Sequence, residues 1–282
     1  NSSLTVTGRN GAGINVSENN SLTIYAQSKG DEMGSLNATG CIGSAGIGGA
    51  LGIYDGDIIG TVSSGVITIN GGRITARGGC GGAGIGGGHD GNGGNITIND
   101  GIVTATGGSY GAGIGGGEGG DSGNVTIYNG TVKATGGFLA AGIGGGKGGD
   151  SGNVTINNGK VTATGGSNGA GIGGGFHIKL DEGSGGTIII NNYPTVIATG
   201  RGSAADIGNG TNSIGRTIIK RGDVEGTDLT YVRLEVQNLS PDNSNKITFN
   251  EQEHEINNEG LTGFFVEKST ESISISLESA GP

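Results

Sequence analysis

The sequence lacks tryptophan and is poor in aromatic residues, which make up only 4% of the chain. A buried core must therefore be built from small aliphatic side chains. Proline occurs only 3 times, and the 69 glycines follow no Gly-X-Y period, so a collagen triple helix is excluded. No apolar run approaches the roughly 20 residues that a membrane-spanning helix requires, so we expect no membrane insertion.

Positive charge is also scarce. The 15 lysines and arginines stand against 25 aspartates and glutamates, which gives a net charge of −10. We expect charge to be confined to insertions in the turns, and an acidic surface without a basic stripe argues against nucleic acid and anionic membranes as partners. The chain starts at Asn1, without a methionine or a signal peptide, so we expect a fragment of a longer protein.

The abundant feature is a repeat of 29 residues. Gly-Ala-Gly-Ile-Gly-Gly-Gly begins at Gly82, Gly111 and Gly169, and a variant begins at Ala140. Typical copies lead through a polar turn to Asn-[Val/Ile]-Thr-Ile, an Asn-Gly-type corner and Val-x-Ala-Thr-Gly-Gly. Such a period predicts a solenoid whose units bury their apolar faces by stacking on one another.

One repeat contains three short strands. Residues 153–156 and 160–164 alternate between apolar and polar side chains, and residues 170–172 form the third strand. Asn and Gly suit the corners because they tolerate positive φ. Three strands and three corners predict one triangular coil of a parallel β-helix. The third-strand pattern occurs seven times, so we expect about seven coils. Its inward positions include Ile47, Ile85, Ile114, Ile143, Ile172 and Ile207.

The repeat pattern ends before the chain does. We assign residues 1–216 to the β-helix. From about Thr217 glycine becomes rare and charge rises, and short alternating segments predict a small all-β module over residues 217–282. Its position would let this module cap the C-terminal end of the solenoid.

Two cysteines precede the third strands of neighbouring coils. Cys41 lies six residues before Ile47, and Cys80 lies five residues before Ile85. Neighbouring coils lie about 4.8 Å apart, within the range of Cα separations that a disulfide requires. We therefore predict a Cys41–Cys80 disulfide, which would imply an oxidising, extracellular setting. The alternative is a pair of buried, reduced thiols.

Asparagine recurs at the end of the turn that follows the third strand. Asn95, Asn124 and Asn153 share one column of the predicted stack. Side-chain amides in such a column hydrogen-bond from coil to coil, so we interpret them as a structural ladder rather than a binding site.

The outward positions of the predicted second strands form two columns rich in threonine. The candidate binding residues in them are Thr75, Arg77, Thr104, Thr106, Lys133, Thr135, Thr162 and Thr164. A flat Thr-x-Thr lattice resembles the ice-binding face of antifreeze β-solenoids, but Arg77, Lys133 and Ile197 interrupt it. The other interpretations are a sugar-binding face and no binding at all, because threonine is a favoured outward residue of strands.

The outward positions of the predicted third strands are almost all glycine. They are Gly13, Gly46, Gly84, Gly113, Gly142 and Gly171, followed by Asp206. Glycine weakens a strand and often marks the close approach of another backbone or ligand. One hypothesis is self-association through this glycine face. The others are contact with the rest of the parent chain, a flat saccharide, and coils so narrow that they need glycine to bend.

Insertions lengthen the turn after the third strand at residues 49–65 and 175–186. They supply the further candidate contact residues Tyr54, Asp55, Asp57, His177 and Asp181. Gly-Gly-x-Gly-x-Asp segments that end at Asp121 and Asp150 match the start of calcium-binding nonapeptide repeats, but the nine-residue period is missing. Calcium is therefore a weak expectation, and no cofactor is required.

Catalysis has little support in the sequence, which shows no nucleophile motif and no zinc-ligand spacing. Parallel β-helix enzymes that resemble pectate lyases or polygalacturonases gather acidic and basic residues on one strand face. Threonine and glycine occupy the corresponding faces predicted here. A lyase or glycoside hydrolase would need a site assembled between the insertions, so an enzyme is the less favoured alternative.

Residues 4–216 resemble the glycine-rich, right-handed parallel β-helix repeats, pectate-lyase-like solenoids, of secreted or wall-attached proteins of Gram-positive bacteria. The resemblance rests on Gly-Ala-Gly-Ile-Gly-Gly-Gly, Asn-Val-Thr-Ile and Val-x-Ala-Thr-Gly-Gly. Such proteins are described as carbohydrate-binding or adhesion proteins. The resemblance therefore implies a polysaccharide or host glycan as the partner, and an extracellular location.

The sequence thus favours an all-β, right-handed parallel β-helix that acts as a non-catalytic, extracellular carbohydrate-binding or adhesion module. We expect the threonine face and the two insertions to make the contacts. The alternatives are an ice-binding protein that uses the threonine face, a polysaccharide-cleaving enzyme with its site in the insertions, and an assembly module that uses the glycine face.

Overall fold

The chain forms β-sheets and no helix in the residues that the structure describes. The computed structural model describes residues 2–26, 33–54, 57–61, 63–177, 186–191 and 194–211, and beyond residue 211 the strands named below. For residues 52–61 and for those beyond residue 211, only the backbone is described. Within these residues, no helix is long and apolar enough to cross a membrane.

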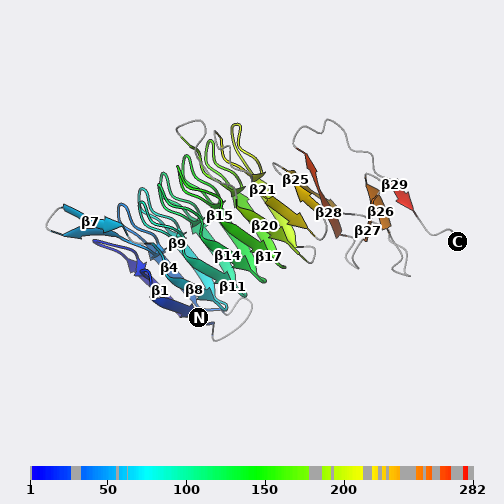
Figure 1. Ribbon diagram of the computed structural model, residues 1–282. Helices are drawn as coiled ribbons and strands as arrows, with labels where there is room; N and C mark the ends of the chain where they lie inside the picture. The colour runs from blue at the N-terminus through cyan, green and yellow to red at the C-terminus, as the bar shows by residue number, and fades with distance from the viewer. Residues whose placement is uncertain are drawn as a thin grey trace.

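Three sheets run along a stack of coils (Figure 1). The first sheet consists of the parallel strands β3 (Ser21–Ile24), β8 (Val66–Ile69), β11 (Asn95–Ile98), β14 (Asn124–Ile127), β17 (Asn153–Ile156), β20 (Thr187–Ile190) and β23 (Ile218–Arg221), and of β24 (Val224–Gly226), which pairs antiparallel with β23. The second sheet consists of β1 (Ser3–Thr7), β4 (Ser35–Thr39), β9 (Arg73–Arg77), β12 (Ile102–Thr106), β15 (Thr131–Thr135), β18 (Lys160–Thr164) and β21 (Thr195–Thr199), all parallel. The third sheet consists of the two-residue parallel strands β2 (Ile14–Asn15), β5 (Ile47–Gly48), β10 (Ile85–Gly86), β13 (Ile114–Gly115), β16 (Ile143–Gly144), β19 (Ile172–Gly173) and β22 (Ile207–Gly208).

Each coil gives one strand to each sheet, and equivalent residues of neighbouring repeats pair with one another. Ile96 pairs with Val125 in the first sheet, and Val103 pairs with Val132 in the second. The second and third sheets each contain seven strands, which confirms the expectation of about seven coils. The fold is therefore a right-handed parallel β-helix, as predicted.

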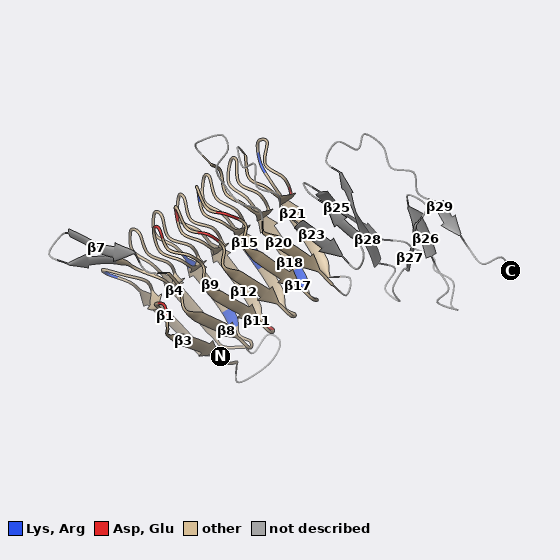
Figure 2. Cartoon of the chain, in the orientation of Figure 1, with Lys and Arg blue, Asp and Glu red and all other residues tan. Residues whose placement is uncertain are grey.

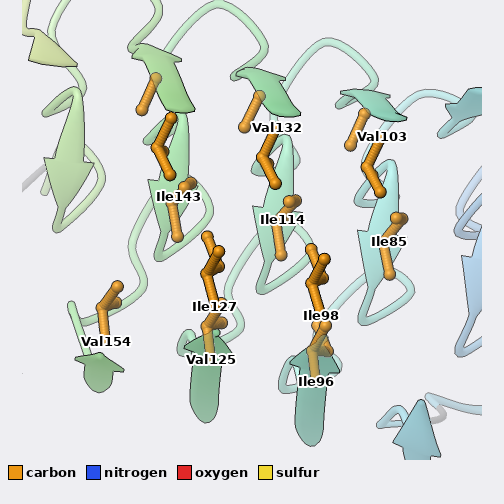
Figure 3. Packing of buried hydrophobic residues seen from close by; sticks show 14 of the residues in the cluster. Ile85, Ile96, Ile98, Val103, Ile114, Val125, Ile127, Val132, Ile143 and Val154 are labelled. Atoms are coloured by element: carbon orange, nitrogen blue, oxygen red, sulfur yellow. The ribbon is translucent and has the colours of Figure 1, made fainter. Parts of the chain in front are cut away.

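The interior of the helix is filled by columns of small aliphatic side chains (Figure 3). Ile85, Ile98, Ile114 and Val103 have no solvent-exposed surface. Strand alternation explains the pattern, since Ile96 and Ile98 of β11 and Val103 and Ala105 of β12 point inward while the threonines between them point outward. Burial of each such side chain stabilises the fold by about 1.5–3 kcal/mol. The predicted inward columns are thus confirmed.

The glycines predicted to face outward on the third sheet are buried from Gly46 to Gly171. A Cβ atom at Gly84 would lie 2.6 Å from the carbonyl oxygen of Gly113 and 2.7 Å from the backbone nitrogen of Thr106. Both of those residues belong to the next coil, so the backbone that approaches Gly84 is the chain's own. The prediction of an exposed glycine face is wrong, because the backbone of the next coil fills the space that a side chain at Gly46, Gly84 or Gly113 would need. The hypothesis of self-association through this face required exposed glycines, and these glycines are buried.

The predicted Cys41–Cys80 disulfide is not formed, and both cysteines are free. The third-sheet register pairs Ile47 with Ile85, while the two cysteines lie six and five residues before these isoleucines. That offset of one residue places Gly79 rather than Cys80 over Cys41, and a Cβ atom at Gly79 would overlap the Cys41 carbonyl oxygen. The prediction failed because it treated the two spacings as equivalent. The argument for an oxidising compartment fails with it.

The remaining strands lie outside the repeat pattern. β6 (Leu51–Tyr54) and β7 (Asp57–Thr61) form an antiparallel hairpin within the first insertion. β25 (Leu229–Glu235) pairs antiparallel with β28 (Leu261–Glu267), and β26 (Lys246–Phe249) pairs antiparallel with β27 (Gln252–Glu255) and β29 (Ser276–Glu278). Since β23 lies beyond residue 216 and still belongs to the first sheet, the assignment of residues 217–282 to a separate module stays a prediction.

Candidate binding surfaces

The outer face of the second sheet presents the predicted threonine columns. One column runs through Thr75, Thr104, Lys133 and Thr162, and the next runs through Arg77, Thr106, Thr135 and Thr164. The residues between them, such as Ala105, point inward and are buried. The side chains of both columns therefore stand on the solvent side of the sheet. The columns exist as predicted, and their role in binding stays a prediction.

A third outward column, which no sequence motif indicates, lies at the start of the same strands. It consists of Ser3, Ser35, Arg73, Ile102, Thr131, Lys160 and Thr195. It brings the number of cations on this face to four, namely Arg73, Arg77, Lys133 and Lys160, which we call the second-sheet cations. The interpretation that charge is confined to the insertions, and that the chain has no basic stripe, is therefore wrong for this face.

The second-sheet cations face no acidic residue on their own sheet. None of the seven strands of the second sheet contains aspartate or glutamate. Every ion pair found among the described residues lies in the turns, and none involves a second-sheet cation. Figure 2 shows basic positions on the strands, while acidic positions gather in the turns. A chain of net charge −10 therefore displays one sheet face whose charges are all positive.

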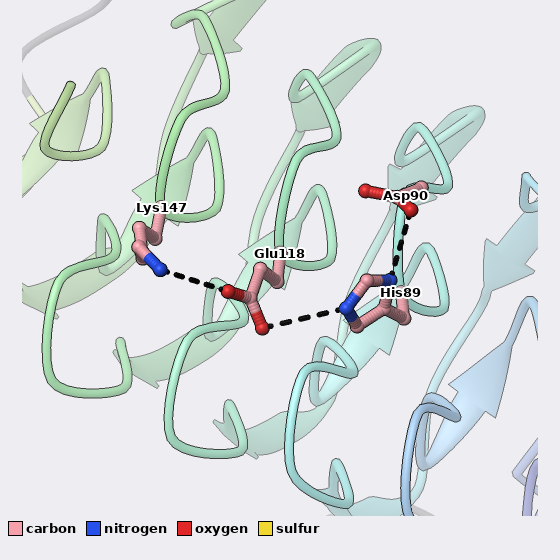
Figure 4. A network of polar contacts seen from close by, with 4 residues as sticks. All are labelled: His89, Asp90, Glu118 and Lys147. Carbon is pink, nitrogen blue, oxygen red and sulfur yellow. Dashed lines mark hydrogen bonds and ion pairs between the residues drawn. The ribbon is translucent and has the colours of Figure 1, made fainter. Parts of the chain in front are cut away.

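The acidic positions gather in the turns that lead from the third sheet to the first, residues 87–94, 116–123 and 145–152, which we call the turn edge. His89, Glu118 and Lys147 lie one repeat apart and stack on this edge (Figure 4). Lys147 Nζ lies 2.9 Å from Glu118 Oε1, and His89 Nε2 lies 3.6 Å from Glu118 Oε2. Asp90 Oδ2 lies 3.1 Å from His89 Nδ1. The repeat spacing that revealed the asparagines would also have revealed this row.

One aromatic residue, Tyr110, packs against the same row. Lys147 Nζ lies 4.5 Å from the centre of the Tyr110 ring, and the Lys147 amide donates a hydrogen bond to the Tyr110 carbonyl oxygen. Only 21% of the Glu118 and Lys147 side chains is exposed, so the pair is largely shielded from water. The row therefore joins three consecutive coils through the Lys147–Glu118 ion pair and the contact between Glu118 and His89.

The two calcium candidates use their carboxylates to hold the coils together. Asp121 Oδ1 accepts a hydrogen bond of 2.9 Å from the Asp150 amide, and Asn92 Oδ1 accepts one of 2.9 Å from the Asp121 amide. Asp150 Oδ1 lies 3.6 Å from Nε2 of His177. In the described part of the chain, no three His, Cys, Asp or Glu side chains come together in a way that could hold a metal ion. These contacts favour a structural role, and calcium binding stays a prediction.

The predicted asparagine ladder is formed on the first sheet. Asn124 Nδ2 donates to Asn95 Oδ1 at 2.8 Å, and Asn153 Nδ2 donates to Asn124 Oδ1 at 3.0 Å. A second ladder that was not predicted lies at the opposite end of the same strands. It comprises the pairs Asn99–Asn70 and Asn191–Asn157, with Tyr128 between them in the stack.

The candidate residues in the insertions are only partly placed. Asp55 and Asp181 lie outside the described residues, and Tyr54 and Asp57 are described by their backbone in β6 and β7. His177 is 4% exposed, so its ring is not on the surface as a contact residue would be. Among the described residues, these candidates in the insertions therefore add no side chain to a defined surface.

A comparison with protein-family models agrees with this architecture. The model described as "Beta helix repeat" matches residues 67–89, 96–118, 125–147 and 154–176, each from the first sheet to the turn that follows the third sheet. These four segments are β-helix repeats. Each β-helix repeat contributes one turn of the solenoid, and the matched segments contain Arg73, Arg77, Lys133 and Lys160. The comparisons with curated proteins and with solved structures give no match.

Proposed function

We propose that this protein is a non-catalytic, extracellular module that binds a polysaccharide along the outer face of its second sheet. The observation that carries the proposal is a regular face of seven strands on which threonine hydroxyls recur with basic side chains that have no partner of opposite charge among the described residues. Its extracellular placement rests on the resemblance of the repeats to those of secreted and cell-surface proteins.

The dimensions of the face suit an extended polymer. Seven strands at about 4.8 Å spacing give a surface of about 30 Å along the solenoid. Hydroxyl groups that both donate and accept hydrogen bonds recur on it at the spacing of the coils. A repeating polymer can contact equivalent groups on successive coils, so many weak contacts would add up along the face.

The turn edge supports a non-catalytic role. It is the only place in the described part of the chain where acidic and basic side chains converge, as a polysaccharide-cleaving enzyme would require. There Glu118 uses one carboxylate oxygen for Lys147 and the other for His89. Lys147 belongs to the following coil and His89 to the preceding one, so the contacts serve the stacking of repeats.

The test is a binding assay of the whole chain against an array of neutral and acidic polysaccharides, with thermal hysteresis measured on the same sample. The variant pair Thr104→Val and Thr135→Val removes two hydroxyls from the second sheet and keeps their shape. We expect it to weaken binding about tenfold, because each lost hydrogen bond costs about 0.5–1.5 kcal/mol.

The matched control is Thr97→Val with Thr126→Val, which changes two outward threonines of the first sheet. It should bind like the original chain. Equal loss in the control and in the second-sheet variant would place the contact elsewhere, and no binding to any polysaccharide would overturn the proposal. Thermal hysteresis without polysaccharide binding would favour the ice-binding alternative.

A further inference from the structure

The second-sheet cations are arranged diagonally rather than stacked. Arg77 is the fifth residue of β9, Lys133 the third residue of β15 and Lys160 the first residue of β18. With about 3.3 Å per residue along a strand and about 4.8 Å between strands, their Cα atoms lie about 12 Å and about 8 Å apart in sequence order. Arg73 lies on the same strand as Arg77. The row therefore crosses four consecutive coils.

The neighbours of each cation in the stack are uncharged. Lys133 lies between Thr104 and Thr162, and Lys160 lies between Thr131 and Thr195. Like charges directly opposite one another on a sheet are destabilising, and the diagonal arrangement avoids this. The face thus holds several positive charges without stacking any two of them.

Two described carboxylates near this face, Asp100 and Asp206, accept hydrogen bonds from backbone amides. Asp100 precedes β12 at the corner of the coil, and its Oδ1 accepts a hydrogen bond from the Gly101 amide. Asp206 lies beyond the other end of the second-sheet strands, and its Oδ1 accepts a hydrogen bond from the Gly200 amide. Neither forms an ion pair with a second-sheet cation among the described contacts. The positive charge of the face is therefore available to a ligand.

We infer that the polysaccharide bound by this protein is a polyanion, whose carboxylate or sulfate groups lie along the diagonal of Arg77, Lys133 and Lys160. The inference rests on the proposed function and names its substrate class. A protein of net charge −10 repels polyanions as a whole, so attraction depends on this local row. Binding is then strongly salt-dependent, because exposed charges are screened within about 10 Å at 0.1 M salt.

Nucleic acid fits the face less well than a charged polysaccharide does. Single-stranded nucleic acids are held by aromatic side chains on which bases stack, as well as by positive charge. None of the seven strands of the second sheet contains an aromatic residue. Threonine hydroxyls and cations instead match the hydroxyl and acidic groups of a sugar polymer.

The experiment compares polymers that differ only in charge. Carboxymethylcellulose is compared with hydroxyethylcellulose, dextran sulfate with dextran, and a single-stranded DNA is added as a further polyanion. Affinities of the whole chain are measured at low and at high salt. We expect at least tenfold tighter binding to one or both charged polymers than to their neutral counterparts, and loss of that preference at high salt. The two charged polymers distinguish carboxylate from sulfate.

The variant Lys133→Gln with Lys160→Gln removes two charges from the diagonal. It should lower affinity for the charged polymer at least tenfold. The control, Arg9→Gln with Arg201→Gln, removes two exposed charges from turns near the two ends of the stack and should change affinity less than twofold. Unchanged unfolding midpoints would show that both variants fold.

The outcomes separate the two proposals. Equal binding of charged and neutral polymers, unaffected by the Lys133 and Lys160 changes, would overturn the polyanion inference and leave the proposed function intact. No binding to any polysaccharide would overturn both. DNA binding as tight as that of the charged polysaccharides, and equally sensitive to the variant, would overturn the choice of a polysaccharide.

Discussion

Charged side chains are arranged in opposite ways on the turn edge and on the outer face of the second sheet. On the turn edge, His89, Glu118 and Lys147 lie in the same column of successive coils, and Glu118 lies 2.9 Å from Lys147 and 3.6 Å from His89. On the second sheet, Lys133 and Lys160 lie in different columns and have threonines as neighbours. Aligned charges of opposite sign hold coils together, whereas staggered charges of one sign add nothing to stacking. The difference separates a structural surface from a surface suited to binding.

The largest contrast should appear when one residue in each region is replaced by alanine. A Cβ atom at Gly117 on the turn edge would overlap the carbonyl oxygen of Gly88 in the preceding coil. We expect Gly117→Ala to destabilise the fold by about 3 kcal/mol or more, because backbone must move to make room. Thr106→Ala on the second sheet should cost less than about 1 kcal/mol. Guanidinium unfolding followed by circular dichroism measures both, and similar losses would remove the contrast.

The asparagine ladder beside the turn edge allows a graded test of coil-to-coil contacts. Asn124 takes part in two side-chain hydrogen bonds, and Asn153 takes part in one. Asn124→Ala should therefore cost about 2 kcal/mol, and Asn153→Ala about half as much. The same unfolding experiment measures both. Equal effects would indicate that the amides are bonded mainly to water.

Replacing one lysine in each region compares the two surfaces directly. Lys147→Met breaks the pair with Glu118 and the contact with Tyr110, so we expect a loss of about 1 kcal/mol and unchanged polysaccharide binding. Lys133→Met should change stability by no more than about 0.5 kcal/mol and should weaken binding. Unfolding midpoints and binding isotherms are measured on both variants. If Lys133→Met proved the more destabilising, the assignment of roles would be reversed.

The smallest effect is expected at the cysteines, which lie in neither region. Because Cys41 and Cys80 are free, a reducing agent should not shift the unfolding midpoint, and Cys80→Ser should change stability by no more than about 0.5 kcal/mol. A clear destabilisation by the reducing agent would show that a disulfide forms after all. Thiol titration under denaturing conditions provides an independent count of free cysteines.

The repeat made much of the fold predictable, because residues one period apart must occupy equivalent positions in a stack. The columns of Ile96 and Val103 and the ladder through Asn124 followed directly from this spacing. The failures came from features that a period does not encode. Whether Gly84 faces solvent depends on the path of the next coil, and the position of Cys80 depends on a shift of one residue.

The sequence predicted only two of the four second-sheet cations. Arg77 and Lys133 interrupt the regular threonine columns and are therefore evident in the repeat, but Arg73 and Lys160 lie in a column that contains no regular motif. The charge row of the turn edge was missed although its members lie one repeat apart. The spacing that aligns the asparagines also aligns His89, Glu118 and Lys147, and only the distances between their side chains required the structure.

Because every coil closes in the same register, the solenoid acts as a molecular ruler. One more repeat would lengthen the second-sheet face by about 4.8 Å and leave the contacts of the existing coils unchanged. The length of polymer that the face can cover is therefore counted in repeats. Which acidic groups along that polymer are recognised depends separately on which repeats carry lysine or arginine, so reach and selectivity can vary independently in such a chain.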